Sequence, residues 1–225
     1  MQEKTVGRGG KMIYLLSDIH AGLEHIDGLR HYLDNADESD LLIILGDVGV
    51  RFEDTPENRE FDRLFLSSSR RIAFIDGNHE NFDYINSCPE EDWAGGRVHR
   101  LTDNIVHLER GYVYRTDGFS FFTFGGCSSS DSWRESGPWY PEESPSSEEL
   151  RRAYSNLDSV GRRVDFVLTH KYQSEHDERD GELFRLCSFI EESVEYRHWY
   201  AGHWHVERKR DEKHTFIYNS LIKLG

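Results

Sequence analysis

Side chains that bind metal ions recur along this sequence, and each set of them follows a short apolar run. The oxygen and nitrogen donors of aspartate, asparagine and histidine suit Mn, Fe, Zn and similar divalent ions. Seven such donors follow five apolar runs: Asp18, His20, Asp47, Asn78, His170, His203 and His205. Seven ligands are too many for one tetrahedral site, so the pattern predicts two metal ions that keep positions open for water and substrate.

One carboxylate must be shared if two cations lie side by side, because only a carboxylate bridges two cations comfortably. Asp47 follows Leu41 to Leu45, five apolar residues without any polar alternation. Such a run predicts a strand buried on both faces, as in a sheet covered by helices on either side. We therefore expect Asp47, at the end of a central strand, to be the bridging ligand.

A βαβ rhythm in the first third of the chain predicts how the early donors are positioned. Strands are expected at Met12 to Ser17, Leu41 to Leu45 and Arg71 to Asp76, with helices from about His25 to Asn35 and from about Glu57 to Ser68. The strand ends lie about thirty residues apart, which is the length of a βαβ unit. Because the carboxyl ends of parallel strands meet at one edge, the first four donors should lie together there.

The middle of the chain has a different pattern. Short alternating segments at Asn104 to Glu109, Gly111 to Arg115 and Phe119 to Phe124 predict antiparallel strands or a second sheet. Residues 125 to 146 have no clear periodicity, and a loop of this length is usually functional or disordered. Its large aromatics, Trp133, Trp139 and Tyr140, argue against plain disorder.

The last third returns to alternating helices and strands. Ser146-Ser147-Glu148-Glu149 has the pattern of a helix start, and that helix should run to about Asp158. Further elements are a strand at Val164 to Thr169, a helix near Gly181 to Glu192, a strand at Tyr196 to Ala201 and a last strand region at Thr215 to Leu224. The late histidines again follow strands.

Length and charge limit the class of protein. At 225 residues, one α/β domain spanning 1–225 is expected, with a flexible, glycine-rich N-terminus over 1–11. A net charge of −15 disfavours bulk nucleic-acid binding and an anionic membrane surface. Three widely spaced cysteines and the lack of a membrane-length apolar run indicate a cytoplasmic protein with no membrane partner. The sequence does not determine the oligomeric state.

The donor blocks, taken in order, resemble the signature of calcineurin-like metallophosphoesterases. The blocks are Asp18-x-His20, Gly46-Asp47, Gly77-Asn78-His79-Glu80, His170 and Gly202-His203-x-His205. The resemblance runs from about residue 13 to residue 205, and residues 125–128 and 139–143 are also similar to a subset of small bacterial and phage phosphoesterases. It implies an α/β fold of two facing mixed β-sheets flanked by helices, a four-layer α/β/β/α sandwich.

The resemblance also implies how the donors divide between the two metals. Asp18, His20 and His205 would hold one ion, and Asp47 would be shared by both. The other ion would be held by Asn78, His170 and His203. Two divalent ions are thus the expected cofactors, with Mn²⁺ ranked first and Fe or Zn as alternatives.

The charge of such a centre favours a phosphate-ester substrate. Two divalent cations against two carboxylates leave roughly two positive charges at a partly dry site. Metals about 3.5–4 Å apart activate a bridging hydroxide for in-line attack. The expected function is hydrolysis of a phosphodiester or small phosphomonoester, with His79 protonating the leaving oxygen, a role worth about 10²–10⁴-fold. Arg51 and Arg134 are expected substrate contacts.

Two other functions compete with this one. In the protein-phosphatase branch an acid and an arginine stand three and four residues after the bridging aspartate, where this chain has Val50 and Arg51. Because the acid that would orient His79 is missing, the sequence favours a phosphoprotein phosphatase less. A non-catalytic protein-binding scaffold should have lost ligands or His79, and this chain has lost none.

Some nearby residues are interpreted as structural. Histidines outside the blocks are expected to be solvated or structural: His25, His31, His99, His107, His176, His198 and His214. The acids Glu142, Glu143, Glu148 and Glu149 are expected at a helix start and on the surface. Cys127 is expected to be a small buried residue, and no thiolate is expected to compete with the other donors.

Overall fold

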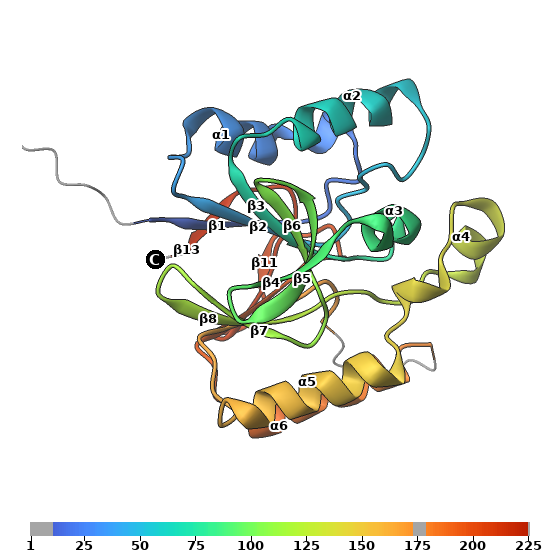
Figure 1. The fold of residues 1–225 in the computed structure, drawn as a ribbon. Coiled ribbons are helices and arrows are strands. Elements are labelled where there is room, and N and C mark those ends of the chain that lie inside the picture. The colour runs from blue at the N-terminus through green and yellow to red at the C-terminus, as the bar shows by residue number, and fades with distance from the viewer. Residues whose placement is uncertain (1–10, 173–178, 225) are drawn as a thin grey trace, which may run out of the picture.

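The computed structural model describes residues 11–172 and 179–224. In this part of the chain two mixed β-sheets face each other, and helices cover their outer faces (Figure 1). The predicted four-layer α/β/β/α sandwich is therefore confirmed. The predicted flexible N-terminus falls almost entirely on residues 1–10, and His176 on 173–178, so both predictions lie outside the described residues.

The first sheet carries the early donors. Its strands are, in spatial order, β13 (Ile222–Leu224), β1 (Ile13–Leu16), β2 (Leu41–Leu45), β3 (Arg71–Ile75), β6 (Ile105–Leu108), β5 (Gly96–Thr102) and β4 (Glu90–Trp93). β1, β2 and β3 are adjacent and parallel, as the βαβ rhythm predicts. Their carboxyl ends therefore lie at one edge.

The second sheet carries the late donors. Its spatial order is β11 (Arg208–Lys209), β12 (His214–Phe216), β10 (His198–Ala201), β9 (Phe166–Thr169), β8 (Phe119–Phe124) and β7 (Val113–Thr116). β8, β9 and β10 are parallel neighbours. The middle of the chain is thus divided between the sheets: β6 lies between β3 and β5 in the first sheet, and β7 and β8 belong to the second.

Four of the helices form the two outer layers. The helices of the described residues are η1 (Leu23–His25), α1 (Asp27–Asn35), α2 (Pro56–Leu66), α3 (Phe82–Ser87), α4 (Asp131–Ser136), η2 (Pro141–Glu143), α5 (Ser147–Ser159) and α6 (Gly181–Ser193). α1 and α2 lie on one outer side of the sandwich, and α5 and α6 lie on the other (Figure 1). No helix within residues 11–172 and 179–224 is both long and apolar enough to cross a membrane.

Strand β2, between β1 and β3, is buried on both faces, but helices cover only one of them. Leu42 and Ile44 belong to the core that includes residues of α1 and α2. Leu41, Ile43 and Leu45 belong to the core between the sheets, together with residues such as Phe121 and Leu168. The expectation of helices on either side of β2 is therefore wrong, because an apolar face requires apolar cover and a second sheet supplies it equally well.

The segment from 125 to 146 is also more ordered than its pattern indicated. It contains α4 and the short helix η2. The Ser130 side chain caps α4 by accepting a hydrogen bond from the backbone N–H of Trp133 at 3.3 Å. A six-residue helix spans fewer than two turns, so it leaves no measurable periodicity in the sequence.

The start of α5 matches the sequence pattern. Ser146 Oγ accepts from the backbone N–H of Glu149 at 3.2 Å, and the Glu149 carboxylate accepts from the backbone N–H of Ser146 at 2.6 Å. This capping box satisfies two backbone donors at the helix end. On the buried side of α5, Leu150, Ala153 and Leu157 pack into the core over the second sheet.

We predict that Ser146→Ala lowers the free energy of unfolding by about 1 kcal/mol, because the helix loses its side-chain cap. Urea denaturation followed by circular dichroism measures the change. Ser155→Ala is the matched control, since Ser155 is an exposed residue of the same helix and alanine is the better helix former. Equal effects of the two substitutions would contradict the capping role.

Candidate metal centre

The predicted donors come from the carboxyl ends of five strands in two sheets. Asp18, Asp47 and Asn78 follow β1, β2 and β3 of the first sheet. His170 follows β9 and His203 follows β10 in the second sheet. Because the sheets face each other, donors from both can reach the same space. The structure brings the seven donors into two neighbouring clusters.

The first cluster holds Asp18, His20, Asp47 and His205, whose donor atoms all lie within 4.8 Å of one another. His20 Nε2 and His205 Nε2 are 2.9 Å apart. His205 Nε2 lies 3.4 Å from Asp18 Oδ1, and His20 Nε2 lies 3.5 Å from Asp47 Oδ2. Two carboxylates and two imidazoles thus converge on one point.

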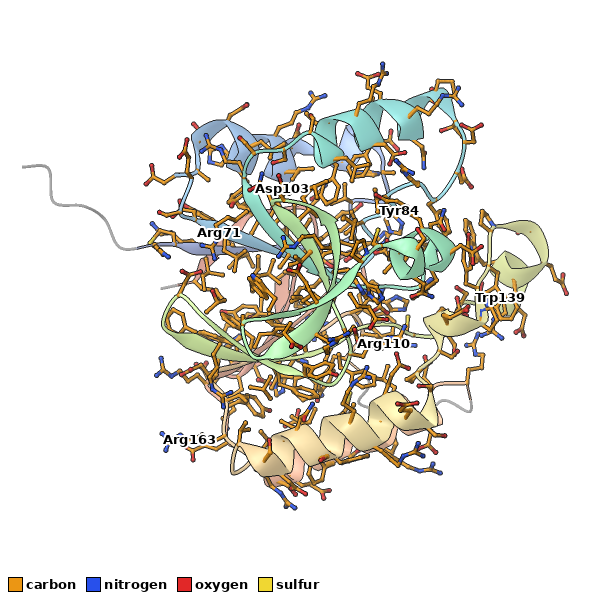
Figure 2. The ribbon with its side chains drawn as sticks, viewed as in Figure 1. Arg71, Tyr84, Asp103, Arg110, Trp139 and Arg163 are labelled. Carbon is orange, nitrogen blue, oxygen red and sulfur yellow. The ribbon has the colours of Figure 1, made fainter. Side chains whose placement is uncertain are left out.

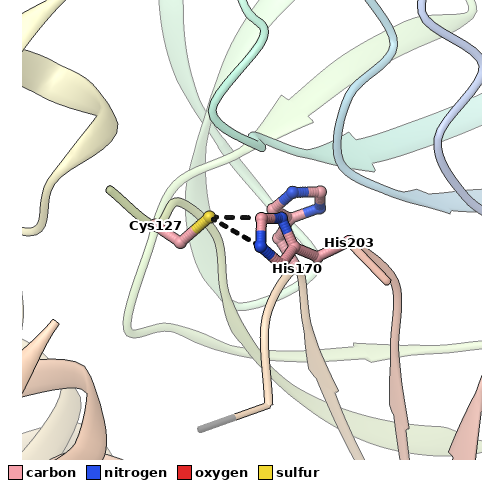
Figure 3. A group of neighbouring side chains, drawn as sticks. All are labelled: Cys127, His170 and His203. Carbon is pink, nitrogen blue, oxygen red and sulfur yellow. Dashed lines mark hydrogen bonds between the residues drawn. The ribbon is translucent and has the colours of Figure 1, made fainter. Parts of the chain in front are cut away.

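The second cluster holds His170, His203 and a cysteine, Cys127, again within 4.8 Å of one another (Figure 3). Asn78 Oδ1 lies 3.3 Å from His170 Nε2 and 3.2 Å from Cys127 Sγ. Cys127 is fully buried, as expected. Its sulfur lies beside the predicted donors, so the expectation that no thiolate competes with them stays a prediction. The missed signal is that Cys127 follows the apolar strand Phe119–Phe124, as each other donor follows its own strand.

Asp47 lies between the two clusters. Its Oδ2 is 3.5 Å from His20 Nε2 and 3.5 Å from His170 Nε2. Its Oδ1 accepts a hydrogen bond from the backbone N–H of His79 at 2.8 Å, which fixes the carboxylate plane. One oxygen is therefore aimed at the space shared by donors from both sheets.

The spacing of the donors fits divalent metal ions. Bonds of about 2.0–2.3 Å at tetrahedral angles place ligand atoms about 3.3–3.6 Å apart. Five of the six separations given above are 3.2 to 3.5 Å, and the separation of 2.9 Å between His20 and His205 is shorter. Nitrogen, oxygen and sulfur donors of this kind, five of the eight buried, form a suitable set for Mn, Fe or Zn.

Backbone strain is concentrated at the same place. Five of the seven predicted ligands, Asp18, His20, Asp47, His203 and His205, have φ between 49° and 70°. They are half of the ten non-glycine residues with positive φ in the described part of the chain. L-residues adopt this region rarely, and such outliers cluster at functional sites.

Two glycines make room for the donors. A Cβ on Gly77 would lie 2.0 Å from Asp47 Oδ1 and 2.5 Å from the Asp47 backbone nitrogen. A Cβ on Gly46 would lie 2.4 Å from His170 Nδ1, and Gly46 also has a φ of +88°. The glycine before each donor therefore allows a neighbouring strand end to approach closely.

Hydrogen bonding fixes the tautomer of His170. Its Nδ1 lies 2.8 Å from the carbonyl oxygen of Leu45, which can only accept, so Nδ1 carries a proton. Nε2 is then the atom directed at Asp47 and Asn78. A backbone carbonyl that orients the far nitrogen of a histidine is a common support for a metal ligand.

Neighbouring charges and burial shift the pKa values of Asp47 and His170 in opposite directions. Burial would raise the pKa of Asp47, but the adjacent His170 and His20 hold it below its usual range. Burial would lower the pKa of His170, but the Asp47 carboxylate raises it well above the usual value. Burial and the nearby His170 lower the pKa of His203 to about 3, which leaves His203 neutral and able to donate a lone pair at neutral pH.

His79 lies beside the clustered donors. Its ring centroid is 5.0 Å from that of His20 and 4.4 Å from that of Trp133, which belongs to α4. Burial lowers the pKa of His79. His79 therefore lies between the clustered donors and the 125–146 segment.

The two predicted substrate arginines contact other groups. The Arg51 guanidinium carbon lies 4.3 Å from the ring centroid of Tyr84, in α3. Arg134 Nη2 donates to Glu143 Oε1 at 2.9 Å, and its guanidinium carbon lies 5.1 Å from the Trp139 ring centroid, close to α4 (Figure 2). A direct role of either arginine in substrate binding stays a prediction.

Two glutamates near the site are buried supports. Glu143 is fully buried and accepts from the backbone N–H of Ser129 at 2.7 Å, so its predicted surface position is wrong. Glu80 was not singled out, although it belongs to the Gly77–Glu80 block. It accepts from the backbone N–H groups of Val48 and Gly49 at 2.8 and 3.1 Å. Burial and the nearby Asp47 raise its pKa to about 8.

A hollow of about 510 Å³ adjoins the second cluster. Its lining includes Asn78 and His203 from the cluster, with His79 beside them. Trp133 and Trp204 add aromatic surface to the lining, and Lys171, Arg179 and Ser128 to Ser130 complete it. A small ligand in this hollow would touch both His79 and the clustered donors.

Comparisons with known proteins give matches only at the level of structure. No protein-family model and no curated protein sequence matches the chain. A phosphopantetheinyl hydrolase from Mycobacterium tuberculosis is similar over 93% of this chain and 88% of its own, at 16% identity and a TM-score of 0.47. A protein of unknown function from Aquifex aeolicus is similar over 95% and 96%, at 16% identity and a TM-score of 0.44. Both TM-scores are below 0.5, so the function is inferred from the site geometry of this chain.

We predict that Gly77→Ala lowers the metal content of the protein, because the new Cβ displaces the Asp47 carboxylate. Elemental analysis after Mn²⁺ loading and desalting should give less than half of the wild-type content. Gly22→Ala is the control, since a Cβ there meets no atom closer than 3.5 Å. Unchanged metal content in a folded Gly77→Ala protein would contradict the packing argument.

Proposed function

We propose that this chain is a calcineurin-like phosphoric ester hydrolase with a dinuclear metal centre. The observation that carries the proposal is the position of Asp47 Oδ2, which lies 3.5 Å from one histidine of each cluster. A carboxylate oxygen in that position can bridge two cations, and a bridged pair is typical of enzymes that displace phosphate esters in line. The proposed substrate is a phosphodiester or a small phosphomonoester.

The residues would divide the ligation by cluster. Asp18, His20 and His205 would hold one ion, and Asp47 would contact both. Asn78, His170 and His203 would hold the second ion. Bound there, two divalent ions would supply Lewis acidity that activates water and neutralises phosphate oxygens. Mn²⁺, Fe or Zn would suit the donors.

The side chains around the centre would position the substrate. The hollow beside the second cluster would hold the alcohol part of the ester against Trp133 and Trp204. His79, whose ring packs against Trp133, would place its imidazole near the leaving oxygen and deliver a proton to it. Burial lowers the pKa of His79 and the Asp47 charge opposes that shift, so a negative charge close to the ring would favour the protonated form that donates the proton.

We predict that Asp47→Asn strongly lowers metal-dependent turnover. Asparagine keeps an oxygen for the His79 backbone N–H, but it places an amide group between the clusters, where a cation must bind. Hydrolysis of bis(p-nitrophenyl) phosphate with added Mn²⁺ should fall by about three orders of magnitude, the order that loss of a group acting on the reacting centre costs. Asp83→Asn is the control because Asp83 is exposed. Unchanged turnover in Asp47→Asn would reject the mechanism.

His79→Ala should separate metal binding from catalysis. We expect wild-type metal content with kcat lowered by about 10²–10⁴-fold, because the proton donor is lost while the ligands remain. Elemental analysis and steady-state kinetics on the same preparation give both quantities, with exposed His31→Ala as the control. If metal is lost together with activity, His79 is itself a ligand and its assignment here is wrong.

A further inference from the structure

We propose that Cys127 Sγ is a direct ligand of the metal ion held by Asn78, His170 and His203, so that only one of the two metal positions has a sulfur donor. The proposal rests on the proposed dinuclear centre and adds a ligand to one half of it. Cys127 Sγ lies 3.2 Å from Asn78 Oδ1 and 3.4 Å from His203 Nδ1 (Figure 3). It is also within 4.8 Å of the donor nitrogen of His170.

These distances match ligands that share one ion. With bonds of about 2.3 Å to sulfur and about 2.0–2.1 Å to nitrogen or oxygen, neighbouring ligands of one ion lie about 3.1 Å apart at right angles and about 3.5 Å apart at tetrahedral angles. The observed separations of 3.2 and 3.4 Å fall between these values. A thiol donates one hydrogen, here to Asn78 Oδ1, and its sulfur accepts only weakly, so hydrogen bonding by itself gives little reason for further polar groups to gather around it. Cys127 instead faces three donor groups at once, and all three are predicted ligands of the same ion.

The backbone around Cys127 holds the sulfur in this place. Cys127 follows β8, which pairs in parallel with β9, so the sulfur approaches the centre one strand away from His170. The Gly126 backbone N–H donates to the carbonyl oxygen of Asp76 at 2.9 Å. The Asp76 carboxylate accepts from Arg110 Nε at 2.8 Å, and both side chains are buried. The loop is therefore anchored to the end of β3, which carries Asn78.

A sulfur ligand would make the two metal positions chemically different. The first cluster offers two carboxylates and two imidazoles, whereas the second offers a thiolate with two imidazoles and an amide oxygen. Thiolate ligands favour Zn²⁺, Fe²⁺ and Co²⁺ over the harder Mn²⁺. The inferred ion at the second position is therefore one of these softer ions, while Mn²⁺ suits the first. Binding exchanges the S–H bond for a sulfur–metal bond, and the proton leaves to the buffer.

Cobalt titration of the full chain tests the proposal directly. Anaerobic addition of Co²⁺ to the metal-free protein should produce a sulfur-to-cobalt charge-transfer band in the near ultraviolet. Cys127→Ser should still bind Co²⁺ through the remaining donors but lack the band, with affinity at that position lowered by about 100-fold or more, the upper end of what loss of an outer partner costs. Cys88→Ser is the control because Cys88, near the end of α3, donates to the Tyr84 carbonyl instead. The charge-transfer band of Cys88→Ser should match that of the wild type.

Each outcome decides between the proposals. Two bound Co²⁺ ions without the band in the wild type would overturn the sulfur ligand and leave the dinuclear centre standing. A band that persists in Cys127→Ser would also overturn it. No Co²⁺ binding to the folded wild type would overturn both proposals. X-ray absorption of the zinc-loaded wild type needs no variant to fold, and the expected result is a sulfur scatterer at about 2.3 Å from zinc. Its absence would overturn the sulfur ligand.

Discussion

The contact on which the rest of the site depends is the approach of Asp47 to histidines from two sheets. Its Oδ2 is equally far from His20, in the first sheet's loops, and from His170, in the second. That position requires β2 inside one sheet, between β1 and β3, and β9 in the facing sheet. It also requires Gly77, because any side chain there would occupy the space of the carboxylate.

Burying a carboxylate in such a place is costly, and the surrounding residues offset the cost. Removing a charged group from water is unfavourable unless the charge is paired and hydrogen-bonded. The Asp47 side chain is about 2% exposed, and it is paired with His170 and accepts from the His79 backbone N–H. Cations bound between the clusters would offset the same charge more fully. The residues that stabilise the buried Asp47 charge are therefore the same ones that the proposed metal centre would use.

Loops with positive φ make this arrangement rigid. The backbone N–H groups of Asp18 and His20 donate to the carbonyl oxygens of Gly46 and Asp47 at 3.1 and 2.7 Å. The buried Glu80 ties the chain after β3 to the loop after β2 by accepting from Val48 and Gly49. Strained backbone persists only where the surroundings over-determine it. Here hydrogen bonds between the loops that follow β1, β2 and β3 stabilise the strained backbone, and the same loops carry the donors.

The sequence by itself determined the parts that depend on local pattern. The five apolar residues of β2, the βαβ rhythm and the Ser146 capping box predicted strands, parallel order and a helix start, and donors placed after strands predicted where the clusters lie. Only the tertiary structure decided that a sheet covers the inner face of β2, that Glu143 is buried, and that Cys127 joins His170 and His203. Periodicity reports that a face is buried without reporting what buries it, because the partner comes from a distant segment of the chain.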